Sequence, residues 1–210
     1  MNTHFNHSEM PKFMNGFSQQ MRFSMAMNQR IIMLYDDVDD NSMMESIYYL
    51  NKLKYMDEKF CDDKKPIEIQ INTCGGAVED GLSLLSLIEN MKSDGYRIIT
   101  TNIGRGYSMG FFLSICGTER RAYKYAKYMY HDVSYGVYGK HGNILEQVEF
   151  TEKIQKDMIS IATKYTNLSE DFFLDINARK ADKYFTVLML EVSIRLIKRL
   201  RSSSCSGISQ

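Results

Sequence analysis

Short apolar segments alternate with longer amphipathic segments along most of the chain, and their two periodicities predict strands and helices. Around residue 70, isoleucines alternate with Glu68 and Gln70, which is the period of a half-buried strand. Compact apolar or aromatic runs predict further strands at 31–34, 98–103 and 127–131. Apolar residues three or four positions apart predict helices at 43–56, 78–91, 108–116, 144–161 and 169–176. This repeated alternation indicates an α/β fold.

The chain divides into one expected domain and two flanking segments. Its 210 residues are enough for one sizeable hydrophobic core. Residues 1–28 are polar, rich in Asn and Met and weakly periodic, so we expect a mobile N-terminal arm. Residues 29–200 carry the strand and helix patterns and form the expected domain. The tail RSSSCSGISQ at 201–210 predicts disorder.

Charge and composition exclude several classes of function. Lys plus Arg and Asp plus Glu balance at 26 each, so neither nucleic acid nor an acidic membrane is favoured as a partner. The N-terminus has no apolar stretch of the signal-peptide kind, and the most apolar segment, 187–197, is broken by Glu191 and Arg195. The four scattered cysteines lack metal-ligand spacing, which predicts free thiols, no metal site and a cytoplasmic location.

The sharpest local motif is Gly106-Tyr107-Ser108-Met109-Gly110, placed where a strand pattern ends and a helix pattern begins. Glycines permit a tight turn there and let a substrate backbone approach the serine. Ser108 would stand at a helix N-terminus, where free N–H groups favour negative charge. The pentapeptide alone does not separate a nucleophile from a serine that only caps a helix.

A nucleophilic serine needs a base, and the chain offers four histidines. His4 and His7 fall in the expected arm. His141 lies in a glycine-rich segment, which positions a catalytic group poorly. His131 ends a predicted strand and therefore has a rigid mount. It is the favoured base, although an isolated histidine is more often structural.

The carboxylate that would orient the base and the donors that would bind an oxyanion are less clearly marked. Asp132 follows His131 directly, but neighbours on a strand point to opposite faces. Asp182 lies between two lysines, as exposed turn carboxylates do, so spacing alone does not select it. Gly75-Gly76 lies between a strand and a helix, where its N–H groups either face an oxyanion or only form a turn. The lack of a P-loop lysine argues against nucleotide binding.

Taken in order, five segments resemble the ClpP family, the proteolytic subunits of Clp ATP-dependent proteases. No single segment is decisive, but their order and separations make the likeness specific. The likeness runs from about residue 30 to residue 186. The segments are RIIML at 30–34 for the family's RIIFL, INTCGG at 71–76 for INSPGG, YSMG at 107–110 for ASMG, MYH at 129–131 for MIH, and ADKYFT at 181–186 for RDRFMS.

The resemblance implies roles for residues of this chain. Ser108 would be the nucleophile, His131 the general base and Asp182 the residue that orients the imidazole. The backbone N–H groups of Gly76 and Met109 would form the oxyanion hole. Peptide hydrolysis through an acyl-enzyme would follow, without a metal or organic cofactor. The residues expected to contact substrate are Gly75, Ser134, Tyr135 and Gly136.

The same resemblance implies an architecture and partners. We expect a ClpP- or crotonase-like fold of repeated β-β-α units, with segment 134–142 and helix 144–165 as a protruding handle. Family subunits stack as two rings, expected to be heptameric, around a chamber. A hexameric Clp-type ATPase feeds unfolded protein into that chamber. An extended stretch such as 134–139 could pair with a substrate strand.

Departures from the family pattern leave alternatives open. Cys74 replaces a proline, Asp132 and Val133 replace Gln-Pro, and the sequence after Thr186 differs from the family's acidic helix and following strand. A ring subunit that assembles without cutting therefore stays a hypothesis. An α/β-hydrolase esterase would share the Gly-x-Ser-x-Gly turn but would need His141 as its base. A crotonase-type acyl-CoA enzyme would have no use for a Ser–His pair.

Overall fold

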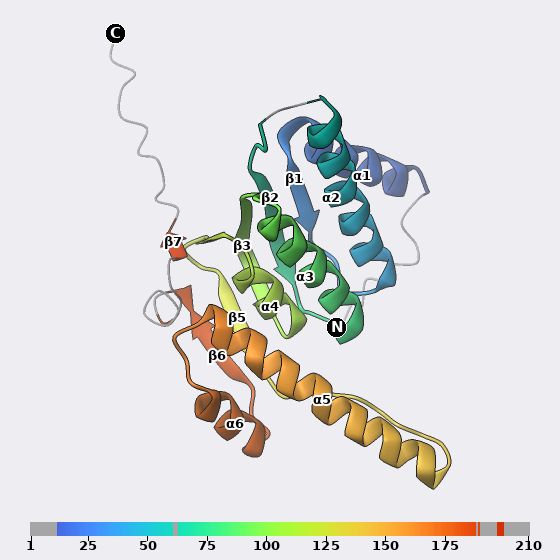
Figure 1. Cartoon of the computed structure of the whole chain (residues 1–210), viewed down its shortest axis with the longest axis vertical. Coiled ribbons are helices and arrows are strands. Elements are labelled where there is room, and N and C mark those ends of the chain that lie inside the picture. Colours follow the sequence, from blue (N-terminus) through green and yellow to red (C-terminus); the bar gives the residue numbers. More distant parts are fainter. Residues whose placement is uncertain (1–11, 61–62, 188, 190–196, 200–210) are drawn as a thin grey trace, which may run out of the picture.

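Parallel strands joined by crossover helices form most of the molecule (Figure 1). The computed structural model describes residues 12–60, 63–187, 189 and 197–199. The strands are β1 (Ile31–Leu34), β2 (Ile67–Thr73), β3 (Ile98–Tyr107), β4 (Glu119–Ala122), β5 (Lys127–Tyr130), β6 (Lys183–Thr186) and β7 (Ile197–Arg199). The helices are α1 (Lys12–Ser24), the short π-helix η2 (Met25–Gln29), α2 (Asp40–Phe60), α3 (Val78–Ser93), α4 (Met109–Ile115), α5 (His141–Tyr165) and α6 (Glu170–Ala178). The predicted α/β fold class is confirmed.

The sheet is organised around β3. Its strand order is β1-β2-β3-β4-β7, and β5 joins it through β3. The first half of β3 pairs in parallel with β2 and β4, whereas Arg105, Gly106 and Tyr107 at its end pair with β5. β6 then adds to β5 in the antiparallel direction. The end of β3 is therefore the point at which the central sheet meets the β5–β6 ribbon.

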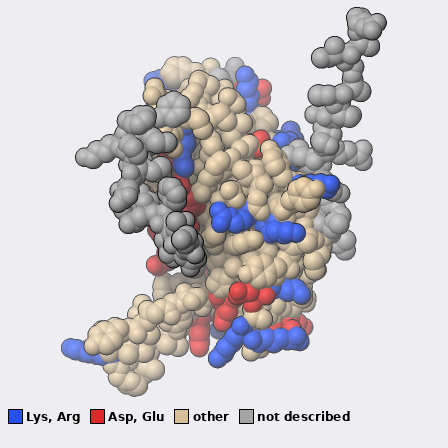
Figure 2. Space-filling model, turned by 180° about the vertical axis from the view of Figure 1, so that it is seen from behind, with Lys and Arg blue, Asp and Glu red and all other residues tan. Residues whose placement is uncertain are grey.

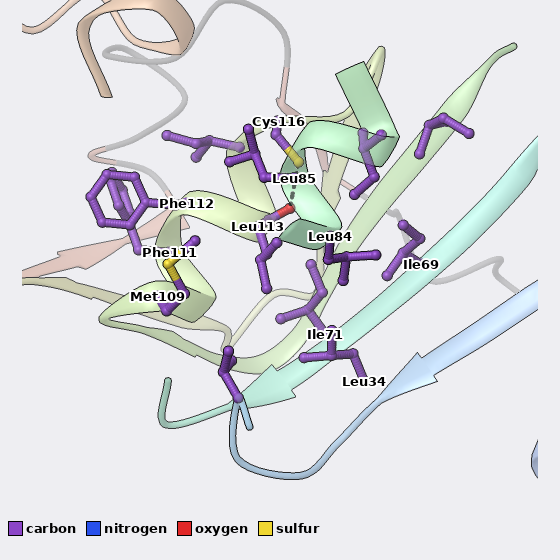
Figure 3. Packing of buried hydrophobic residues seen from close by; sticks show 14 of the residues in the cluster. Leu34, Ile69, Ile71, Leu84, Leu85, Met109, Phe111, Phe112, Leu113 and Cys116 are labelled. Carbon is purple, nitrogen blue, oxygen red and sulfur yellow. Dashed lines mark hydrogen bonds between the residues drawn. The ribbon is translucent and has the colours of Figure 1, made fainter. Parts of the chain in front are cut away.

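The core fixes the position of the residues at the start of α4. β2 follows the predicted alternation, with Ile67, Ile69 and Ile71 buried, and burial of each isoleucine contributes about 2 kcal/mol. All seven residues of α4 are buried. Figure 3 shows Leu113 of α4 in the same cluster as Leu84 of α3 and residues of β1 and β2. Packing on this scale leaves the N-terminus of α4 little freedom to move.

Gly104 and Gly106 lie inside β3, although the sequence predicted a strand only over 98–103. A Cβ atom on Gly104 would lie 2.6 Å from Oδ1 of Asn72, and one on Gly106 would lie 2.6 Å from Oγ of Ser114. Glycine is therefore required by close packing against neighbouring side chains. The strand continues to Tyr107 because β5 supplies a partner beyond residue 103.

Strands β4 and β6 were not predicted from the sequence. β4 reads Glu-Arg-Arg-Ala and has no apolar alternation. Glu119 of this strand forms ion pairs with Arg97 and Arg121. In β6 only Phe185 is buried. Both strands form because a partner strand lies beside them, which is a tertiary effect that overrides weak local propensity.

Helices occupy the part of the expected arm that the structure describes. Residues 12–29 form α1 and η2, and Ala26 is fully buried. Arg22 of α1 lies 2.5 Å from Asp36 and 3.5 Å from Glu45 of α2, so charge links the first helix to the second. Residues 1–11 and the predicted disordered tail at 201–210 lie outside the described residues.

The expected handle projects from the body of the molecule (Figure 1). Residues 131–140 run outward beside α5, and α5 returns from the tip over 25 residues. The helix begins at His141, three residues before the predicted start. Large apolar side chains on the handle are exposed, namely Tyr138, Leu145 and Phe150.

The described surface carries charges of both signs. On the face seen in Figure 2, Lys and Arg and Asp and Glu form small separate groups among broad uncharged areas. This face therefore shows no single-sign patch of the kind that binds a polyanion. Within the described ranges, no helix combines the length and apolar content that crossing a bilayer requires.

Candidate active site

Ser108 occupies a strained position between β3 and α4. Its backbone has φ 53° and ψ −122°, a region that residues with a side chain rarely adopt. The Ser108 N–H donates to the carbonyl of Met129 at 2.9 Å, and the Ser108 carbonyl accepts from Phe111 N–H at 2.9 Å. The turn is thus held from β5 on one side and from α4 on the other. Such a strand-to-helix turn presents a serine hydroxyl as serine hydrolases do.

His131 reaches Ser108 from the end of β5. Tyr107 pairs with Met129, so Ser108 and His131 follow this last pair of the two strands by one and two residues. Nε2 of His131 lies 2.9 Å from Oγ of Ser108. Nδ1 of His131 hydrogen-bonds to the backbone carbonyl of Asp132. A carbonyl can only accept, so Nδ1 carries the proton and Nε2 is left to accept from the serine hydroxyl.

The other histidine near the handle does not take part in this pair. His141 is the first residue of α5 and is exposed. Figure 1 shows that α5 starts at the outer tip of the handle, far from the end of β3. An esterase that used His141 as its base would need it beside Ser108, so the fold removes that alternative.

The Gly75-Gly76 loop lies against the nucleophile turn. Gly75 has φ 95° and Gly76 has φ 147°, both in the region that favours glycine. A Cβ atom on Gly75 would lie 2.6 Å from the Tyr107 carbonyl oxygen, and one on Gly76 would lie 2.2 Å from the Val38 carbonyl oxygen. Both positions therefore exclude a side chain. The Thr73 hydroxyl accepts from Gly75 N–H at 3.0 Å and fixes the loop.

Gly76 and Met109 line the same cavity as Ser108. Among the described residues, neither amide donates a hydrogen bond to another backbone group. The Met109 amide is one of the free N–H groups that begin every helix. Two such donors beside a serine hydroxyl are an arrangement that can stabilise a negatively charged oxygen.

The cavity at Ser108 has a volume of about 200 Å³. It is mainly apolar on the side of α3, α4 and α5 and polar at the Ser–His pair, which suits one apolar side chain of a substrate. Its lining residues are Cys74, Gly76, Val78, Ser108, Met109, Phe112, Tyr130, His131, Asp132, Val133, Ser134, Gln155 and Met158. In the described part of the chain, no three His, Cys, Asp or Glu side chains lie close enough to hold a metal ion.

Asp182 lies near His131 without contacting it. A second cavity of about 380 Å³ is lined by His131, Ser134, Tyr135, Asp182 and their neighbours. Asp182 is exposed on the loop before β6. Within the described residues no hydrogen bond joins its carboxylate to His131, whose Nδ1 is taken by the Asp132 carbonyl. The structure thus brings two of the three expected triad residues together and leaves Asp182 across a cavity.

Two of the four expected substrate contacts line these cavities. Gly75 lines neither and is buried beneath the Ser108 turn, and Ser134 lines both cavities. Tyr135 lines only the second cavity. Gly136 is exposed further along the extended segment and has no neighbour within 4 Å of a Cβ position.

Sequence reasoning did not select Gln155 or Tyr130 as site residues, although both line the cavity at Ser108. Gln155 of α5 lines the cavity and accepts a hydrogen bond from Val133 N–H at 2.8 Å. The Gln155 Nε2 donates to the hydroxyl of Tyr130 at 3.3 Å, and burial raises the pKa of Tyr130. The sequence did contain a signal for Gln155, because this polar residue lies between Ile154 and Met158 on the apolar stripe of the predicted helix.

Comparison with known proteins identifies the family of the chain. The model of the Clp protease family matches residues 15–187. The chain is 31% identical over 140 residues to the "ATP-dependent Clp protease proteolytic subunit 2" of Prochlorococcus marinus (strain MIT 9312). That alignment covers 64% of this chain and 63% of the relative, somewhat under two thirds of the relative's length. The expected resemblance and its fold are confirmed, and the chain belongs to the Clp protease family.

Proposed function

We propose that this chain is a serine peptidase subunit that hydrolyses peptide bonds of unfolded proteins through an acyl-enzyme. The observation that carries the proposal is the 2.9 Å contact between Ser108 Oγ and His131 Nε2 on a strained strand-to-helix turn. A helix-capping serine would not need a histidine at this distance. Family membership supports the same reaction class.

The reaction uses groups already in place. Ser108 Oγ attacks the peptide carbonyl while His131 Nε2 takes the hydroxyl proton. The carbonyl oxygen becomes negative and is stabilised by the N–H groups of Gly76 and Met109. When the tetrahedral intermediate collapses, His131 gives its proton to the leaving amine. Water then attacks the acyl-enzyme by the same route and restores the Ser108 hydroxyl.

Asp182 is proposed as the carboxylate that stabilises the His131 imidazolium. The carboxylate borders the cavity that His131 also lines. Opposite charges across a partly enclosed site favour the protonated imidazole that forms during acylation. The Asp132 carbonyl already accepts a hydrogen bond from Nδ1 of His131, so the orientation of the ring does not depend on Asp182 alone.

An extended peptide is the substrate form that fits the surface beside Ser108. Residues 134–139 lie outside the strands and helices, so a substrate strand could pair with their backbone groups. Ser134, Tyr135 and Gly136 belong to this segment, and Gly75 supports the opposite side. The apolar cavity would receive one side chain of that strand.

The handle is the proposed contact between subunits. The protruding handle exposes the apolar side chains of Tyr138, Leu145 and Phe150. Exposed apolar side chains grouped on one element are typical of a protein contact surface. The relative from Prochlorococcus is named a proteolytic subunit of an ATP-dependent protease. By that likeness we propose two stacked rings of this chain, heptameric, that receive unfolded protein from a hexameric Clp-type ATPase.

A fluorophosphonate probe tests the peptidase function. The wild-type chain should be labelled at Ser108, and Ser108→Ala should not be labelled. His131→Ala should lower the labelling rate by about 100-fold or more, because the base is lost. His141→Ala is the matched control and should keep the wild-type rate. Rings that assemble by size measurement yet take up no probe would instead identify a non-catalytic ring subunit.

A further inference from the structure

We propose that Gln155 of the handle helix is a positioning residue for His131 and acts through the peptide group between Asp132 and Val133. This inference rests on the peptidase function proposed above and adds a residue to its machinery. Its basis is a chain of hydrogen bonds that runs from the buried core to the nucleophile. Gln155 does not itself contact Ser108 or His131 by a hydrogen bond within the described residues.

The central part of this chain is a single peptide group. The carbonyl of Asp132 accepts from Nδ1 of His131, and the N–H of Val133 donates to Oε1 of Gln155 at 2.8 Å. These two groups belong to the same amide plane, which is rigid and trans. Rotation of that plane would disturb both contacts at once. Holding the N–H end therefore also holds the carbonyl end that orients the imidazole.

Gln155 is itself anchored to the core. Its Nε2 donates to the hydroxyl of Tyr130 at 3.3 Å. Tyr130 is fully buried, and its ring lies 4.8 Å from the ring of Phe173 and 6.0 Å from that of Phe112. Both ends of the Gln155 amide are thus used, and the side chain is half-buried, so water competes little for these contacts.

The Val133 N–H has a second acceptor, which cannot fix the orientation of the peptide group. Oδ1 of Asp132 lies 3.0 Å from this nitrogen. Because Asp132 belongs to the same turn, its carboxylate moves with the peptide group and fixes it to nothing else. Gln155 comes from a different element, 22 residues away, and connects the turn to α5. Of these two contacts, the one with Gln155 ties the Asp132–Val133 peptide group to the body of the protein.

Three variants of the full chain test the role. Gln155→Met keeps length and flexibility but removes the acceptor, whereas Gln155→Glu keeps an acceptor oxygen. Gln147→Met changes an exposed glutamine two turns earlier on α5 and is the matched control. Steady-state hydrolysis of a fluorogenic peptide at pH 8 gives kcat and KM for each. Ring assembly by size and the urea unfolding midpoint are measured in parallel. The titratable groups that line the two cavities beside His131 are Cys74, Tyr130, Asp132, Tyr135, Lys180 and Asp182, and Gln155→Glu adds one carboxylate to them.

The expected result is a selective loss of turnover. Gln155→Met should lower kcat by about tenfold and change KM by less than about twofold, because the contact orients the base and does not bind substrate. Gln155→Glu should recover kcat to within about threefold of wild type, and Gln147→Met should match wild type. If Gln155 had only a structural role, Gln155→Met would lower the unfolding midpoint or ring assembly. It would not lower kcat selectively over KM, and Gln155→Glu would not recover kcat.

Two outcomes would overturn the proposal. One is a Gln155→Met enzyme whose kcat stays within about twofold of wild type. The other is an equal loss in Gln155→Met and Gln155→Glu, since the acceptor oxygen would then not matter. An assembled wild-type chain without peptidase activity is a different result, because it would contradict the proposed function as well.

Discussion

Gly75 approaches Ser108 so closely that a Cβ atom on the glycine would lie 2.6 Å from the Cβ atom of the serine. The same added atom would lie 2.9 Å from the backbone nitrogen of Met109, one of the two proposed oxyanion donors. The loop after β2 and the turn after β3 are therefore packed backbone against backbone. Ser108 and the proposed oxyanion donors keep their relative positions because no side chain separates them.

The first prediction is that Gly75→Ala removes activity, whereas Gly95→Ala does not. Gly95 also has a positive φ, 87°, but nothing lies within 4 Å of its Cβ position. Both variants should lose about 1 kcal/mol of unfolding free energy from backbone strain, and Gly75→Ala should lose more because of its contacts. Fluorophosphonate labelling should fall about 100-fold in Gly75→Ala. A labelling rate in Gly75→Ala close to that of Gly95→Ala would show that the close approach is not needed.

The second prediction concerns Asp182. Because the Asp132 carbonyl holds Nδ1 of His131, Asp182→Asn should lower kcat/KM by less than about tenfold. A carboxylate that holds Nδ1 directly contributes about 10⁴-fold in a Ser-His-Asp triad. Asp175→Asn, on an exposed position of α6, is the control. A loss of about 1,000-fold or more in Asp182→Asn would mean that the carboxylate replaces the carbonyl during turnover.

The third prediction concerns the ion cluster that joins α3 to the base of the handle. Glu89 lies 2.6 Å from Lys92 and 2.6 Å from Lys164, and it also accepts from the Tyr165 hydroxyl. Burial alone would raise the pKa of Glu89, but the hydrogen bonds from Lys164, Lys92 and Tyr165 outweigh it and lower the pKa to about 2. The ionised carboxylate therefore stabilises the folded chain.

Glu89→Gln should lower the unfolding free energy by about 2 kcal/mol at pH 7, measured by urea denaturation. A carboxyl with a lowered pKa contributes fully above its unfolded value, about 4.3, and its contribution disappears as pH falls through the folded value of about 2. The difference between wild type and variant should therefore shrink between these two values. Glu149→Gln, in an exposed pair with Lys153, should change stability by less than about 0.5 kcal/mol. A Glu89→Gln difference that is equally large at pH 2 would not come from ionisation.

The fourth prediction is that a thiol reagent inhibits through Cys74. This side chain is exposed, lines the cavity at Ser108 and lies 3.2 Å from Arg105. N-ethylmaleimide attached there would fill a cavity of about 200 Å³. Cys116 is buried, which raises the pKa of its thiol to about 12, so it should not react at pH 8. Cys74→Ser should be insensitive to the reagent, and continued inhibition of that variant would assign the effect to another cysteine.

Much of the fold was predictable because it depends on local periodicity. The alternation around residue 70 predicted which side chains of β2 are buried, and the spacing of apolar residues predicted the helices α3 and α5. β4 and the end of β3 were not predictable in the same way. Charged residues form β4, and glycines form part of β3, so only the neighbouring strands explain why these segments are extended.

The same distinction between local pattern and packing applies to the candidate site. Local patterns along the chain were enough to predict a serine at a strand-to-helix junction and a histidine at the end of a strand. The packed structure was needed to show which group contacts Nδ1 of His131, where Asp182 lies, and that Gln155 contacts the turn after the histidine. Those contacts join elements far apart in the chain. Their geometry depends on how strands and helices pack, which no local spacing of residues records.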